Sequence, residues 1–186
     1  MALKSTIFRA ALNISDIDRG YYADHVLTVA RHPSETNERM MTRVLAFALY
    51  SSHAKEPLEF GKGLSSDDEP ALWERDLTGR ITQWIEVGIP DEKLLRRACG
   101  RSDAVVLLAY GGGRTVDMWW QANRDALLGQ DKLTVKSVSS TCSKALAAMA
   151  DRALDLQCMI QDGEIWFSDA SERVLVEISQ LMPVTE

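Results

Sequence analysis

The sequence predicts an α+β fold: a compact single domain, residues 1–186, in which flanking helices pack on a mixed β-sheet. Three observations support this prediction. The composition is that of a globular protein, with 46% hydrophobic and 26% charged residues among 186. Residues 5–15 and 21–31 alternate apolar and polar side chains, as strands do. Residues 34–52 carry apolar side chains at helical spacing.

The first helix is expected to follow the two N-terminal strands. Pro33 and Ser34 predict its start, with Ser34 as the N-cap and Glu35 in the first turn, where the helix dipole favours an anion. The helix is expected to end near Ser52. Its buried stripe is formed by Met41, Val44, Leu45, Ala48 and Leu49.

Three short strands, 57–62, 71–77 and 80–87, and a helix over 91–99 are expected next. Pro90 is typical of a helix start and Gly100 of a helix end. Residues 104–109 form a continuous apolar run, which is typical of a strand buried on both faces, and we predict this strand over 103–110. These strands are expected to share one sheet, with 80–87 in its interior.

The remaining chain is predicted to alternate between helices and strands. The expected elements are helix 114–128, strand 132–138, helix 140–150, a hairpin of strands 154–160 and 164–168, and a last strand over 173–178. With residues 5–31, they add strand-rich N- and C-terminal parts to a core over about 34–110.

Charge and cysteine content exclude several classes of protein. The net charge of −6 argues against non-specific coating of nucleic acid, which draws on basic side chains. Cys99, Cys142 and Cys158 are scattered and far from the histidines, so neither a disulfide framework nor a zinc site is expected. No apolar run approaches the ~20 residues of a membrane span. We therefore expect a cytoplasmic protein with no membrane association.

Several motifs resemble those of the YaeQ family. They are residues 32–41 (His-Pro-Ser-Glu-Thr-Asn-Glu-Arg-Met-Met), 63–70 (Gly-Leu-Ser-Ser-Asp-Asp-Glu-Pro), 84–92 (Trp-Ile-Glu-Val-Gly-Ile-Pro-Asp-Glu) and 160–166 (Ile-Gln-Asp-Gly-Glu-Ile-Trp). The resemblance spans the whole chain and implies a compact variant of the PD-(D/E)XK nuclease-like fold. The order helix, three strands, helix, strand over residues 34–110 is similar to the core of that superfamily, in which carboxylates on adjacent strands hold a divalent metal.

Glu86 is the first candidate for such a site. Cleavage of a phosphodiester with Mg²⁺ needs two or more carboxylates that converge on the ion. Glu86 shares a face of its strand with Trp84, so its carboxylate either binds a ligand or forms a salt bridge with a neighbouring arginine. Both interpretations stay open at this point.

The position of the hairpin turn decides which acid faces Glu86. If Thr78 and Gly79 form a two-residue loop, Glu86 faces Ala71 and Asp76 lies ~17 Å away. The acids closest to Ala71 in the chain are Asp67, Asp68 and Glu69. We therefore favour Asp68 or Glu69 as the second carboxylate. A wider loop would make Asp76 a candidate partner of Glu86 again. Alternatively, the run of Asp67, Asp68 and Glu69 is only a solvated loop.

Glu38 and the second helix complete the prediction. Glu38 extends the buried stripe of the first helix, which makes it a further metal ligand unless it pairs with Arg31, Arg39 or Arg43. The superfamily pattern has a lysine where this chain has Gly88. Lys93 in the following helix is the lysine that could replace it, and Arg96 and Arg97 could bind phosphate but not act as a base.

Two functions follow from these residues. In the first, the protein is a nuclease-like enzyme that acts on nucleic acid phosphodiesters, with Glu86, Lys93 and Asp68 as catalytic residues. Its Mg²⁺ ligands would be Glu38, Asp68, Glu69 and Glu86. In the second, the protein is a catalytically inactive nuclease-fold protein that binds a protein or nucleic acid partner in gene expression.

Overall fold

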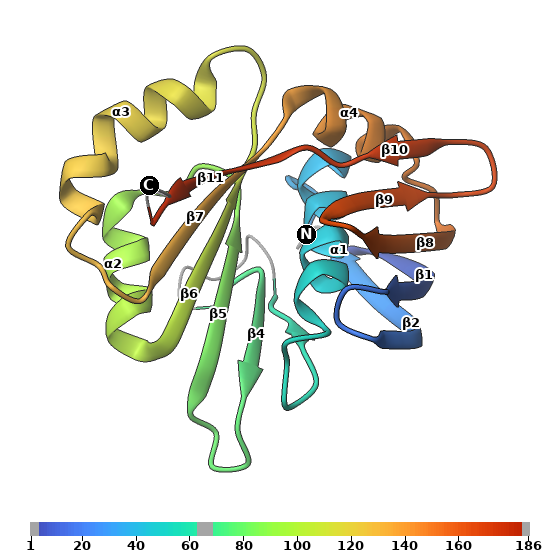
Figure 1. Cartoon of the computed structure of the whole chain (residues 1–186), viewed down its shortest axis with the longest axis horizontal. Helices are drawn as coiled ribbons and strands as arrows, with labels where there is room; N and C mark the ends of the chain where they lie inside the picture. The colour runs from blue at the N-terminus through green and yellow to red at the C-terminus, as the bar shows by residue number, and fades with distance from the viewer. Residues whose placement is uncertain (1–3, 63–68, 184–186) are drawn as a thin grey trace.

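The computed structural model describes residues 4–62 and 69–183, which form two mixed sheets and four helices (Figure 1). The first sheet contains Thr6–Asp16 (β1), Tyr21–Arg31 (β2), Ala153–Gln161 (β8), Glu164–Ser168 (β9) and Arg173–Leu175 (β10). The second contains Glu59–Phe60 (β3), Leu72–Arg75 (β4), Ile81–Val87 (β5), Ser102–Ala109 (β6), Leu133–Val138 (β7) and Ile178–Met182 (β11). The helices are Asn37–Tyr50 (α1), Glu92–Arg101 (α2), Thr115–Leu127 (α3) and Ser140–Ala148 (α4). The predicted α+β class is confirmed.

Strand order shows where the parallel segments lie. The first sheet has the order β10-β9-β8-β1-β2, in which only β1 and β8 are parallel. The second has the order β11-β7-β6-β5-β4-β3, in which β5, β6 and β7 are parallel. Since β5 pairs with β4 on one side and β6 on the other, the expected interior position of residues 80–87 is confirmed.

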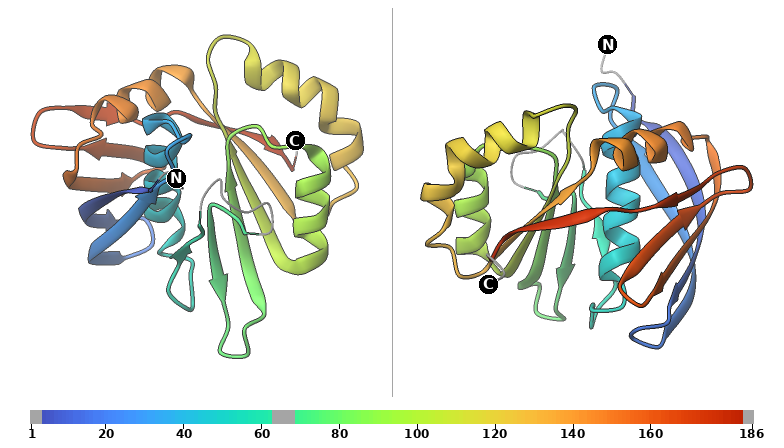
Figure 2. Two further views of the ribbon diagram at one scale, coloured as in Figure 1. Left: turned by 180° about the vertical axis from the view of Figure 1, so that it is seen from behind. Right: turned by 45° about the horizontal axis from the view of Figure 1, so that its top comes forward.

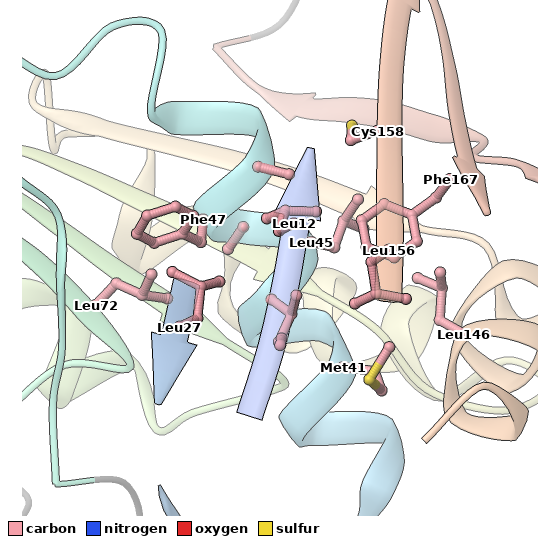
Figure 3. Packing of buried hydrophobic residues seen from close by; sticks show 14 of the residues in the cluster. Leu12, Leu27, Met41, Leu45, Phe47, Leu72, Leu146, Leu156, Cys158 and Phe167 are labelled. Atoms are coloured by element: carbon pink, nitrogen blue, oxygen red, sulfur yellow. The ribbon is translucent and has the colours of Figure 1, made fainter. Parts of the chain in front are cut away.

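Helix α1 lies between the two sheets (Figure 2). Its apolar side chains, such as Leu45, pack against inward residues of both sheets, including Leu12 of β1 and Leu72 of β4 (Figure 3). Helices α2 and α3 cover the opposite face of the second sheet. The alternating residues of β6 belong to both cores, which explains its continuous apolar sequence.

Helix α1 begins three residues later than predicted. The N-cap is Thr36, whose hydroxyl accepts a hydrogen bond from the Arg39 backbone N–H at 3.1 Å, so the prediction that Ser34 caps the helix is wrong. A turn that precedes the helix explains the shift. The Glu35 N–H donates to the His32 carbonyl at 2.8 Å, which keeps Ser34 outside the helix.

The loop between β4 and β5 is wider than the predicted two-residue loop. The Asp76 N–H donates to the Arg80 carbonyl at 2.9 Å, which places residues 77–79 in the loop. Gly79 has a φ of 85°, a conformation that glycine adopts without strain.

The predicted last strand, 173–178, is divided between the two sheets. Residues 173–175 form β10 in the first sheet, and Ile178 begins β11 in the second, so the chain crosses from one sheet to the other (Figure 1). Alternation alone could not reveal this change of partner. Within the described residues, no helix is long and apolar enough to cross a membrane.

Candidate functional site

The parallel strands β5, β6 and β7 end at one edge of the second sheet, and the start of α1 lies at the same edge (Figure 1). Ligands of α/β sheets commonly bind outside the carboxyl ends of parallel strands. A group of polar side chains interacts there. We call this group the carboxyl-edge cluster; its members are Glu35, Glu38, Arg39, Glu86 and Tyr110.

Glu86 is the buried carboxylate of this cluster. Only 6% of the residue is exposed, and its Oε1 lies 3.3 Å from Nη2 of Arg39. The first ladder pair of β4 with β5 joins Leu72 to Ile85, so β4 provides no partner for Val87, whose N–H donates to Oε1 of Glu86 at 3.2 Å. Burial raises the pKa of Glu86 from 4.5 to about 7, although the Arg39 charge and the Val87 N–H both lower it.

Arg39 links Glu86 to a second buried carboxylate. Its Nη1 lies 2.8 Å from Oε1 of Glu35, and the other oxygen of Glu35 lies 2.7 Å from Nη2 of the fully buried Arg43. Sequence reasoning allowed an arginine partner for Glu86 but missed the network with Glu35, because it named Arg39 and Arg43 only as partners of Glu38. The spacing of Glu35, Arg39 and Arg43 at four-residue intervals is the signal that could have identified it.

Glu38 faces α4 rather than an arginine. Its Oε1 accepts a hydrogen bond from the Ser143 hydroxyl at 2.6 Å, and helix α4 packs on α1. For Glu38 the sequence had suggested a metal site or a pair with an arginine. The hydrogen bond with Ser143 is neither of these.

Tyr110 interacts with Glu35 and Glu38 and lies beside the end of β5. Burial raises the pKa of its hydroxyl, and the charges of Glu38 and Glu35 add to this rise, while Arg39 and a hydrogen bond with Thr36 lower it. A side-chain carbon at Gly88 would lie 3.8 Å from the Tyr110 ring. The tyrosine ring therefore lies beside the end of β5.

Gly88 has a φ of 100°, which L side chains rarely adopt. A lysine at this position, as in the superfamily pattern, would be strained.

The structure separates the other acids. Leu72 pairs with Ile85, the register that the hairpin count predicted, because a bulge between Glu74 and Arg75 compensates for the wider loop. Asp76 stays at the far end of the hairpin, where it accepts hydrogen bonds from Thr78 and Arg80. The wider loop therefore does not bring Asp76 to Glu86.

Glu69 pairs with Lys62. Its Oε2 accepts a hydrogen bond from the Lys62 backbone N–H at 3.0 Å, and its Oε1 lies 3.3 Å from Nζ of the same lysine. Asp67 and Asp68 lie outside the described residues. Among the described residues, no three His, Cys, Asp or Glu side chains lie close enough to hold a metal ion.

The cationic residues of α2 lie apart from the cluster. Lys93, Arg96 and Arg97 are exposed and line a groove with Gln130. Nη1 of Arg96 lies 3.7 Å from Oε2 of Glu92, one turn earlier in the same helix. No hydrogen bond or ion pair within residues 4–62 and 69–183 joins these three side chains to Glu86.

Comparison with known proteins gives consistent relatives over the whole length. The family model described as YaeQ protein matches residues 1–178. The uncharacterized YaeQ proteins of Salmonella typhi and Escherichia coli K12 are each 42% identical over 179 residues, covering 96% of this chain and 97% of theirs. The crystal structure of the Xanthomonas axonopodis YaeQ protein is 45% identical with a TM-score of 0.88, covering 95% of this chain and 98% of that one. The Pseudomonas syringae YaeQ structure is 36% identical with a TM-score of 0.89, covering 97% of each chain.

Proposed function

The chain belongs to the YaeQ family, and we propose that it is a cytoplasmic, nuclease-like protein of the PD-(D/E)XK type that acts on nucleic acid phosphodiesters at the carboxyl-edge cluster. One observation carries this proposal: Glu86 is a buried carboxylate with a pKa of about 7 at the end of an interior parallel strand. Carboxyl groups perturbed in this way concentrate at functional sites.

The chemistry of Glu86 suits a divalent cation. Its pKa is raised because the effect of burial outweighs the groups that lower the pKa, among them the Arg39 charge and the Val87 N–H. In this proposal Mg²⁺ would be held by Glu86 and by Asp68, which lies outside the described residues. When bound, Mg²⁺ would polarise a phosphoryl oxygen and activate water.

The arginines and Lys93 have separate parts in this proposal. Because an arginine guanidinium is a poor base, Arg39 would bind a phosphate oxygen or hold Glu86 in place. Because Lys93, Arg96 and Arg97 are exposed and not bonded to the cluster, they contact the backbone of a bound strand outside the scissile phosphate. Lys93 then assists cleavage only through substrate binding.

A second candidate function is favoured by two observations. Arg39 already forms an ion pair with Glu86, and the positive φ of Gly88 disfavours a lysine at that position. These features fit a nuclease-fold protein that binds a nucleic acid or protein partner in gene expression without cleaving it.

Thermal melting with millimolar Mn²⁺ or Mg²⁺ tests the first function. We expect either ion to raise the melting temperature of the wild-type protein, because a ligand that binds only the folded state stabilises it. Glu86→Gln and Asp68→Asn should remove this rise and any metal-dependent cleavage of labelled oligonucleotides. Glu59→Gln, which changes an exposed carboxylate on β3, is the matched control and should keep both.

A melting temperature that neither ion changes would refute the metal-dependent function. If single-stranded oligonucleotides then still raise the melting temperature without being cleaved, the second function is supported. If Lys93→Ala weakens oligonucleotide binding but spares the response to metal, the part assigned to α2 is supported.

A further inference from the structure

A cavity lies between the two sheets at the carboxyl-terminal end of α1, with a volume of about 300 Å³. Apolar side chains line part of it. They are Leu49 of α1, Ile160 of β8, Ile165 of β9 and Ile178 of β11. The segment from β10 to β11 crosses between the sheets beside this region (Figures 1 and 2). The carboxyl-edge cluster lies at the other end of α1, ~20 Å away for a helix of this length.

Three basic side chains line the same cavity: Arg19, His53 and Lys136. Their charges interact, because Arg19 lowers the pKa values of both Lys136 and His53, although burial is the larger cause. Lys136 lies 5.6 Å from the centre of the Tyr50 ring and forms no ion pair with any acid among the described residues. Like charges held together in this way repel one another unless an anion joins them.

Asp16 and Asp18 are the nearby acids; Asp18 also lines the cavity, and both are bonded to other partners. Asp16 is buried and holds Arg19 through an ion pair of 3.1 Å. Asp18 accepts hydrogen bonds from the backbone N–H groups of Asp162 and Gly163, at 2.7 and 2.9 Å. Within the described residues, Lys136 is therefore left without an acidic partner beside an apolar wall.

We propose that this cavity binds a small organic anion, with a carboxylate or phosphate head group at Lys136 and Arg19 and a short apolar body against Leu49, Ile165 and Ile178. The cations supply charge-assisted hydrogen bonds, and the apolar walls bury the hydrocarbon. The volume lies at the lower end of the range for small-molecule sites. Tyr50 also lines the cavity, and its buried hydroxyl has no hydrogen-bond partner in the described part of the chain.

Isothermal titration calorimetry with hexanoate and with hexyl phosphate tests this proposal and separates the two head groups. At least one of them should bind, while hexanol, which lacks charge, and inorganic phosphate, which lacks an apolar body, should bind at least about tenfold more weakly. Lys136→Met keeps most of the side-chain length but removes the charge, and should weaken binding by about tenfold or more. Lys55→Met, at an exposed position outside the cavity, is the control and should bind as the wild type does.

Absence of binding by both hexanoate and hexyl phosphate would overturn the proposal, as would equal binding to wild type and Lys136→Met. If circular dichroism shows that Lys136→Met is unfolded, His53→Gln replaces it, and equal binding of hexyl phosphate to this variant and to the wild type would then count against the site. Glu86→Gln should bind hexanoate and hexyl phosphate as the wild type does, so this test does not depend on the nuclease-like function.

Discussion

Glu86→Gln is expected to abolish a pH dependence of folding stability that one buried carboxyl group causes. The pKa of Glu86 rises from 4.5 in the unfolded chain to about 7 in the folded protein because the side chain is buried. Between these two values the folded state holds a proton that the unfolded state has released. The free energy of unfolding therefore falls as the pH rises through this interval.

The magnitude follows from the size of the pKa change. At ~1.4 kcal/mol per pKa unit, the rise to about 7 corresponds to about 3 kcal/mol of stability. This stability is present in full below pH 4.5 and is lost by about pH 7. Glutamine cannot ionise, so the variant does not lose it. Relative to the wild type, the variant should gain about 2–3 kcal/mol between about pH 5 and pH 8.

Urea unfolding monitored by circular dichroism, repeated across this pH interval, measures the difference. Glu69→Gln is the control, because hydrogen bonds from Lys62 lower the pKa of Glu69 and keep it ionised over the same interval. Its stability difference from wild type should not change with pH. A difference between wild type and Glu86→Gln that stays constant from about pH 5 to pH 8 would refute the reasoning.

Three further variants test the cluster and its supports. Arg39→Met should cost about 3 kcal/mol in urea unfolding, because it removes the shared partner of two buried carboxylates, and a loss below ~1 kcal/mol would contradict this. Thr36→Ala should cost about 1 kcal/mol and lower the melting temperature, whereas an unchanged value would show that the hydroxyl does not cap α1. Gly88→Ala should cost about 1–2 kcal/mol because of its φ of 100°, and a more stable variant would argue against this backbone conformation.

Local patterns were sufficient for most of the secondary structure. Alternation predicted β1 and β2, and a continuous apolar run predicted the doubly buried β6, because each pattern reflects which faces of a single segment meet the core. The hairpin count also predicted the register of β5 with β4 correctly, although the loop was wider than predicted. In that case an unexpected bulge restored the expected pairing of Leu72 with Ile85.

The partners of the candidate site residues could be predicted only in part. Glu38, Glu69 and Glu86 were all chosen as acids near the end of β5, and Glu86 does lie there within a buried cluster. Glu38 instead meets Ser143, a residue 105 positions away in the chain. No local pattern carries information about such a contact, because it depends on how α4 packs on α1.

The sequence by itself therefore determined the α+β class, most helices and strands, and Glu86 as a carboxylate that is either a ligand or an ion-pair partner. The tertiary structure decided that the strands divide into two sheets, that Arg39 joins Glu35 to Glu86, and that Lys136 and Arg19 meet at one cavity. The physical reason is the range of the interactions. Periodicity reports the environment of a segment, whereas charges and cavities depend on side chains that meet only after distant segments have packed.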